Sequence, residues 1–284
     1  MRLVTIHLEK DRYLPGETII GKVSIRTDRS FECNRVVLKI VGKERTEHGS
    51  GDSKTTDERY HISRVFRIRE GGMIPEGLTQ VPFSFHLPWR LPPSYQGHFG
   101  SIEYTVESVV EVNWALDPRL KESFHVIQQR PAVLPEQIDI GPLAKTSGSL
   151  HVHLDSNILR MKRGVRVSFK VSERSRVRGV QVDIMKREEA KCRWHSMKQD
   201  SIIDSKFCPI SIDDFDIWKD ARLGEGGRHY LPFNGDLISV SYLLKVCLDV
   251  ALSFDPEVII PLRISDEAPI DDVLDAIESD LGLF

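Results

Sequence analysis

Cysteine is scarce in this sequence, and long apolar runs are missing. The 284 residues include four cysteines that lie far apart in the chain: Cys33, Cys192, Cys208 and Cys247. This spacing predicts free thiols in a reducing compartment rather than a disulfide framework. No apolar stretch approaches the ~18 residues of a membrane-spanning helix, and the first residues lack the apolar run of a signal peptide. We therefore expect a cytoplasmic protein.

A strong excess of one charge is missing as well. The formal net charge is −3, which gives no indication of a nucleic-acid partner. Hydrophobic residues make up 40% and charged residues 29% of the chain, a balance that is typical of a soluble globular protein. The composition therefore excludes a disordered chain and leaves room for one large or two ordinary domains.

Helical periodicity is almost absent, and apolar residues alternate with polar ones instead. Residues 1–130 contain a series of short alternating segments separated by Pro/Gly turns, which predicts an antiparallel β-sandwich. The hydrophilic stretch from Glu44 to Glu58 is expected to be an exposed loop. Residues 131–149 are rich in proline and glycine and are interpreted as a linker. Alternation resumes over residues 150–264 and predicts a second β-sandwich, so the fold class is all-β with two immunoglobulin-like sandwiches in tandem.

The clearest alternation in the first half follows a proline-rich corner. Ile102, Tyr104 and Val106 share one face of a predicted strand, and Glu103 and Glu107 share the other. The corner contains Pro92, Pro93 and Tyr95 in a PPxY pattern, which WW domains bind as a polyproline helix. A structural corner between two core strands is the favoured interpretation, because recognition needs an accessible extended peptide.

The sequence contains no convincing catalytic or metal-binding constellation. His151 and His153 share a strand face but lack further ligands nearby, and Cys192 with His195 lacks an orienting partner. Nucleophile-elbow, phosphate-loop and zinc-protease motifs are absent. We therefore predict that the protein is not an enzyme and has no catalytic, cofactor-binding or metal-binding residues.

Local charge is more informative than total charge. From Arg160 to Lys198 there are thirteen basic and four acidic residues, a formal +9. Such a surface attracts acidic or phosphorylated proteins or an anionic membrane, although a solvated sheet face is the simpler alternative. The candidate partner-binding residues are Arg160, Lys162, Arg163, Arg166, Lys170, Arg174, Arg176 and Arg178.

The last twenty residues, 265–284, carry seven acidic and no basic residues, a formal −7. Their apolar residues have helical spacing, which predicts a short amphipathic acidic helix or a tail that becomes helical on docking. We hypothesise that this tail docks on the protein's own basic surface through Ile270, Val273, Leu274, Ile277 and Leu281.

Three stretches in the right order resemble the arrestin family in its broad sense. The first is the turn Tyr13–Val23 (YLPGETIIGKV), the second is the corner and strand of 82–106, and the third is 238–264. The resemblance is greatest to arrestin-domain-containing proteins of the α-arrestin type. The retromer small subunit and a bacterial sporulation-control protein share the same fold.

This resemblance implies a non-catalytic cytoplasmic adaptor, with peripheral contact with membranes as an open possibility. Such an adaptor binds a membrane or cargo protein and links it to trafficking or signalling factors, without nucleic acid. The alternative that we keep open is a structural component of a trafficking coat or of a stress or sporulation-control assembly.

Overall fold

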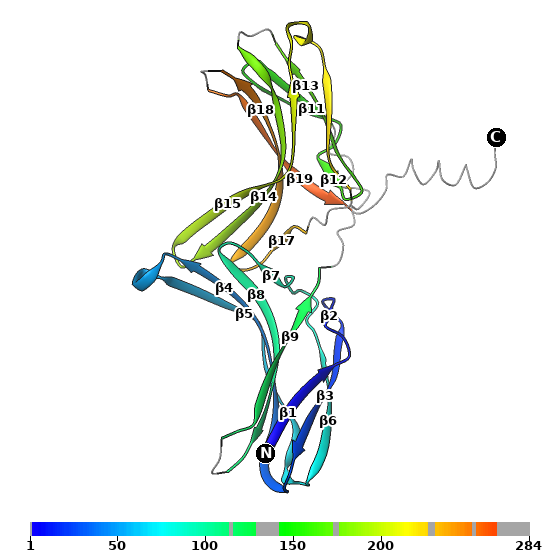
Figure 1. Ribbon diagram of the computed structural model, residues 1–284, viewed down its shortest axis with the longest axis vertical. Helices are drawn as coiled ribbons and strands as arrows, with labels where there is room; N and C mark the ends of the chain where they lie inside the picture. Colours follow the sequence, from blue (N-terminus) through cyan, green and yellow to red (C-terminus); the bar gives the residue numbers. More distant parts are fainter. Residues whose placement is uncertain are drawn as a thin grey trace, which may run out of the picture. The chain divides into compact units, whose positions relative to one another are not determined.

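The computed structural model describes residues 2–113, 116–128, 142–172, 176–226, 231–251 and 254–265. The described residues form β-strands and short 3-10 turns and contain no α-helix, so the predicted all-β fold class is confirmed (Figure 1). No helix in this part of the chain is long and apolar enough to cross a bilayer.

The chain divides into two compact units. The first comprises Met1–Gln129 together with two later segments, Glu189–Met197 and Phe233–Ser239. The second comprises Arg130–Glu188, Lys198–Pro232 and Val240–Phe284. The first unit therefore takes up two short pieces of the second sequence half, which a simple tandem division of the sequence does not include.

In the first sequence half, the residues that the structure describes form nine strands and one 3-10 turn (Figure 1). They are β1 (Arg2–Leu8), β2 (Arg12–Tyr13), β3 (Thr18–Thr27), β4 (Phe31–His48), η1 (Gly51–Ser53), β5 (Thr55–Ile74), β6 (Gly77–His86), β7 (Tyr95–Gln96), β8 (Gly100–Glu111) and β9 (Arg119–Val126). One sheet has the order β1-β3-β6, and the other has the order β2-β9-β8-β4-β5 with β7 paired to β8.

Period-two patterning builds the core between these two sheets. In β3, Ile19, Val23 and Ile25 are buried while the residues between them are exposed or half-buried, apart from the buried Gly21. In β8, the predicted apolar face is buried at Ile102, Tyr104 and Val106. Each such side chain contributes about 1.5–3 kcal/mol on leaving water, so the alternation decides which face of each strand points inward.

The prediction of an exposed loop from Glu44 to Glu58 is wrong. β4 continues to His48 and β5 begins at Thr55, so the two strands form a long hairpin with a short turn. Both Glu44 and Thr46 are fully buried. The hydrophilic composition was misleading because polar side chains on the inward face of this hairpin find hydrogen-bond partners, as described below.

The described residues of the second sequence half form ten strands and a 3-10 turn. They are β10 (Leu143–Ser147), β11 (Leu150–Leu154), β12 (Ile158–Arg160), β13 (Arg163–Val171), β14 (Val177–Cys192), β15 (His195–Pro209), η3 (Ile212–Asp214), β16 (Lys219–Glu225), β17 (Phe233–Asn234), β18 (Ile238–Val250) and β19 (Glu257–Ser265). Their pairing follows the path β10-β11-β13-β12-β19-β18-β14-β15, with β16 paired to β13 and β17 to β18.

Part of the predicted linker is a strand. Residues 131–141 lie outside the described residues, but β10 covers Leu143–Ser147 and pairs antiparallel with β11. The lysine and threonine in β10 are exposed, and the strand therefore lacks the apolar alternation that sequence patterns detect.

Candidate functional site

A buried carboxylate lies on the inner face of β4, just beyond the apolar core. Leu38, Ile40 and Gly42 alternate along this face, and Glu44 and Thr46 continue the same period-two pattern. All five residues are buried. The period-two pattern thus extends past the last apolar residue, and it is the signal that could have identified Glu44, although the composition of this stretch predicts a loop.

The carboxylate of Glu44 accepts hydrogen bonds at both oxygens. The backbone N–H of Ile238 donates to Oε1 at 2.6 Å, and the backbone N–H of Asp236 donates to Oε2 at 2.8 Å. His61 Nε2 lies 2.9 Å from Oε2 and must be the donor, because an ionised carboxylate only accepts. All four residues belong to the first unit, so Glu44 fastens segment 233–239 to the β4–β5 hairpin.

A β-bulge turns His61 toward Glu44. Gly42 is paired with Ile62, but Lys43 is paired with Tyr60, so His61 is an extra residue in β5. An extra residue of this kind interrupts the alternation and redirects a side chain, which is how bulges commonly serve functional sites. The His61 side chain is 10% exposed, and its Nδ1 lies 3.8 Å from Asp236 Oδ2.

The protonation of Glu44 is decided by two opposing effects. Burial raises the pKa of this carboxyl, but the hydrogen bonds from His61 and from the backbone of Ile238, Leu237 and Asp236 outweigh it and lower the pKa. The group is therefore an anion stabilised by converging N–H donors, which is the arrangement that permits a charge in a buried place.

The tip of the same hairpin binds segment 189–197, also within the first unit. Thr46 Oγ1 donates to the carbonyl of Lys191 at 2.7 Å, and the backbone N–H of Arg193 donates to Asp57 at 3.1 Å. The imidazoles of His48 and His195 stack with their centroids 4.2 Å apart. We call Glu44, His61 and Thr46, with the backbone groups that they bind, the polar clamp.

The polar clamp is suited to holding segments together rather than to chemistry. Ligand atoms of Glu44, His61 and Asp236 lie within 4.8 Å of one another. However, both oxygens of Glu44 already accept N–H groups, and a zinc site takes three or four ligands at about 2 Å. A carboxylate with saturated acceptors is also a poor base or nucleophile.

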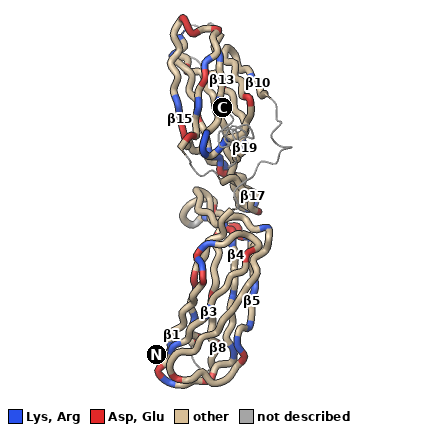
Figure 2. Tube along the Cα trace, turned by 90° about the vertical axis from the view of Figure 1, so that its right-hand side faces the viewer, with Lys and Arg blue, Asp and Glu red and all other residues tan. Residues whose placement is uncertain are grey.

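The predicted basic residues are spread from β12 to the start of β14, and Lys and Arg positions (blue) occur at several places along the second unit in Figure 2. Arg160, Lys162 and Arg163 lie at the start of β13, whereas Arg176 and Arg178 lie beyond its far end. A nine-residue strand spans about 26 Å, which separates the two groups. Arg174 lies outside the described residues.

Three members of the basic set are paired with aspartates on their own unit. Arg166 lies 2.5 Å from Asp220, and Lys170 lies 3.9 Å from Asp216. Arg178 forms a short ion pair with Asp249. The clustering in sequence therefore arises from two successive strands and the turn between them, and much of the charge is balanced locally.

The PPxY segment is integrated into the first unit. Pro93 is buried, and the hydroxyl of Tyr104 donates to the carbonyl of Pro92 at 2.7 Å. The ring of Tyr95 packs against that of Phe233 with centroids 5.0 Å apart. These contacts favour the structural corner over an accessible WW ligand.

The other sequence candidates are likewise occupied by structural contacts. His151 hydrogen bonds to Thr146 and Ser172, and His153 packs edge-on to Trp218. Cys192 is buried with its Sγ 3.4 Å from the carbonyl of Thr55, so it faces backbone rather than His195. The tail residues from Ile270 to Leu281 lie outside the described residues.

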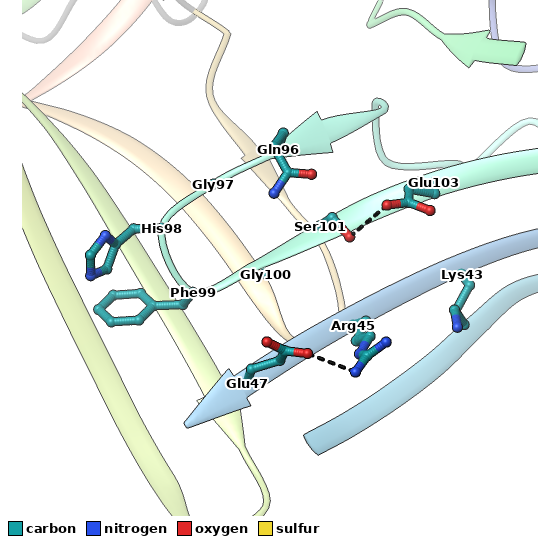
Figure 3. A pocket seen from close by; sticks show the side chains of 10 residues that line it. All are labelled: Lys43, Arg45, Glu47, Gln96, Gly97, His98, Phe99, Gly100, Ser101 and Glu103. Carbon is teal, nitrogen blue, oxygen red and sulfur yellow. Dashed lines mark hydrogen bonds and ion pairs between the residues drawn. The ribbon is translucent and has the colours of Figure 1, made fainter. Parts of the chain in front are cut away.

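A polar pocket of about 280 Å³ lies on the outer face of the six-stranded sheet (Figure 3). Lys43 and Arg45 line it together with the turn that joins β7 to β8. Arg45 pairs with Glu47 at 2.6 Å, and Lys43 pairs with Glu58 at 3.2 Å. Both cations are thus already paired with carboxylates, and Glu103, which also lines the pocket, accepts a hydrogen bond from Ser101 at 3.1 Å.

Comparison with known proteins identifies the first unit. Residues 3–130 match the family model "Arrestin (or S-antigen), N-terminal domain". Arrestin domain-containing protein 17 of Caenorhabditis elegans is 31% identical over 132 residues. The first sequence half is thus similar to the arrestin N-terminal domain, which supports membership of the arrestin family. Arrestin domain-containing protein 1 of Homo sapiens is 24% identical over 130 residues, as is that of Rattus norvegicus.

These alignments cover part of each protein. They include 40% of this chain and 31% of the C. elegans protein, and 45% of this chain and 30% of the human protein. The chain thus spans about a third of the length of these relatives. The arrestin N-terminal domain match contains Glu44 and His61, but the two segments that the polar clamp holds lie beyond it.

Replacing Glu44 with Gln should loosen the arrestin N-terminal domain. The amide removes the negative charge and turns an N–H₂ group toward backbone donors, which costs about 2–4 kcal/mol. Hydrogen exchange of segment 233–239 should accelerate ~30- to 700-fold, since 1.4 kcal/mol is a factor of ten. Glu47→Gln, on the exposed face of β4, is the matched control. Unchanged protection of segment 233–239 in Glu44→Gln would contradict the polar clamp.

The contribution of Glu44 should also depend on pH. Its folded-state pKa is lowered from about 4.5, so the ionised form stabilises the folded unit fully above that pH. The stabilisation is lost as the pH falls through the lowered value. The full chain is unfolded in urea at pH values from 7 to 3, and pulse-labelled hydrogen exchange is read at peptides from the first unit. The unfolding free energy of wild type should exceed that of Glu44→Gln by a constant amount above pH 5, and the difference should shrink in acid. An advantage that grows in acid would reverse the assigned sign.

Proposed function

We propose that this protein is a non-catalytic adaptor of the arrestin type. It binds a membrane or cargo protein and links it to trafficking or signalling factors from the cytoplasm, with peripheral contact with the membrane. The observation that carries the proposal is the match of residues 3–130 to the arrestin N-terminal domain, in a chain that continues into a second all-β unit. The polar clamp supports it as well, because its groups are engaged in holding segments together.

For the adaptor surface we propose the turn between β12 and β13. Arg160 and Lys162 lie there beside Arg163, and neither Arg160 nor Lys162 has a carboxylate at ion-pair distance in the described part of the chain. Acidic or phosphorylated protein segments are the ligands that such a group of cations favours. The aspartate-paired residues of the same set contribute less, since their charge is already balanced.

Proximity labelling in cells tests the adaptor function. The full chain should enrich integral membrane proteins together with trafficking or signalling factors. Arg160→Glu with Lys162→Glu should lower that enrichment, whereas the control pair Arg119→Glu with Lys121→Glu, exposed on β9, should not. Recovery of a soluble assembly of fixed stoichiometry would instead support a structural coat or stress-assembly component, and would overturn the adaptor proposal.

Truncation after Ser265, the last residue of β19, tests whether the acidic tail masks basic surface. Removal of residues 266–284 should raise binding to phosphatidylserine-containing vesicles several-fold, and added salt should abolish the gain. Vesicles of phosphatidylcholine alone are the control. Equal binding by the full and the truncated chain would show that the tail does not mask this surface.

A further inference from the structure

β5 is an edge strand with an open side. It is the last strand in the order β2-β9-β8-β4-β5, and β4 is the only strand that pairs with it among the described residues. An edge strand presents unpaired N–H and C=O groups, which are a template for another extended chain. Edges that are not used for binding are commonly short, irregular or covered, so the length and regularity of β5 matter.

Two bulges delimit a regular stretch of this edge. The register is continuous from the pair Gly42 and Ile62 to the pair Val37 and Arg67, and it shifts on both sides. The shifts leave His61 and Ile68 as the extra residues. Six consecutive residues, Ile62–Arg67, therefore form an even ladder of about 20 Å, which is the length of a short docked strand.

Ile62 is buried, but the side chains from Ser63 to Arg67 point into water on both faces of the strand. Every residue from Ser63 to Arg67 is exposed, and Val65 is 64% exposed. Phe66 is 37% exposed and meets the ring of Phe85 with centroids 5.3 Å apart. A strand that docked here would cover two apolar side chains, one on each face of the sheet.

Arg64 and Arg67 place positive charge at the same edge. Arg64 has no carboxylate at ion-pair distance in the described residues, and Arg67 reaches Glu70, an exposed neighbour on its own strand. Exposed pairs of that kind contribute little. By contrast, each cation on the outer face of β4 has a carboxylate partner, as Arg35 has in Glu111 and Lys39 in Glu107.

We propose that Ile62–Arg67 is a docking edge for an extended acidic peptide of a protein partner. The peptide adds as a further strand beside β5, its backbone pairs with the open N–H and C=O groups, and its carboxylates meet Arg64 and Arg67. A second copy of this chain fits poorly, because pairing two such edges brings like charges together. The proposal rests on the adaptor function and names a partner class for it.

The test uses the full chain and a fluorescent ten-residue peptide of Glu, Val and Thr with Glu on both faces of the added strand, because Arg64 and Arg67 lie on opposite faces of β5. Fluorescence anisotropy should show binding, and a peptide with Lys in place of Glu should not bind. Arg64→Glu with Arg67→Glu should weaken binding at least tenfold. Lys22→Glu with Arg26→Glu, which changes two exposed cations of β3, is the matched control and should leave binding unchanged.

Backbone pairing is tested on the wild-type protein, so that no variant needs to fold. A peptide N-methylated at alternate residues, which cannot extend the ladder, should bind at least tenfold more weakly. Equal binding of the methylated and unmethylated peptides would overturn strand addition. The proposal would also be overturned if the acidic peptide did not bind, or if only the β3 variant lost peptide binding. If peptide binding succeeds while proximity labelling recovers no membrane partner, the adaptor function fails and the edge stands. If proximity labelling recovers membrane partners but the acidic peptide does not bind, only the docking edge is overturned.

Discussion

The buried carboxylate of Glu44 is the constraint on which the first unit depends. A charge with no exposure is tolerated only where donors converge on it, and here N–H groups from β5 and from segment 233–239 do so. If segment 233–239 detached, its backbone N–H groups and the carboxylate of Glu44 would lose the hydrogen bonds between them. The contact between Glu44 and Ile238, which are 194 positions apart in the sequence, thus holds both residues in one compact unit.

This dependence changes how the arrestin match is interpreted. Residues 3–130 contain the whole sandwich of β1 to β9, yet its inner polar face is completed by residues that the match does not include. The N-terminal sandwich alone would leave Glu44 and Thr46 without several of their partners. A domain boundary drawn by sequence similarity therefore differs from the boundary of the cooperative unit.

Alternation of apolar residues was enough to predict the all-β fold, because burial on one face determines strand register wherever Val, Ile and Phe repeat. It failed where polar residues occupied the inner face, as at Glu44, since composition alone suggested a loop. Clustering of charge in the sequence was also a poor guide to the surface. Arg166 and Arg178 lie on different strands and face aspartates that are 54 and 71 residues away. Partners at such separations come only from the tertiary fold.

The bulge at His61 connects the two features of β5. One extra residue redirects the imidazole inward to Glu44, and the same residue ends the even ladder of Ile62–Arg67. A strand that docks on that ladder would rigidify the segment next to the bulge and so bear on the contact between His61 and Glu44. The docking edge and the polar clamp are therefore neighbours along one strand, and binding at the first has a direct covalent route to the second through residues 61 and 62.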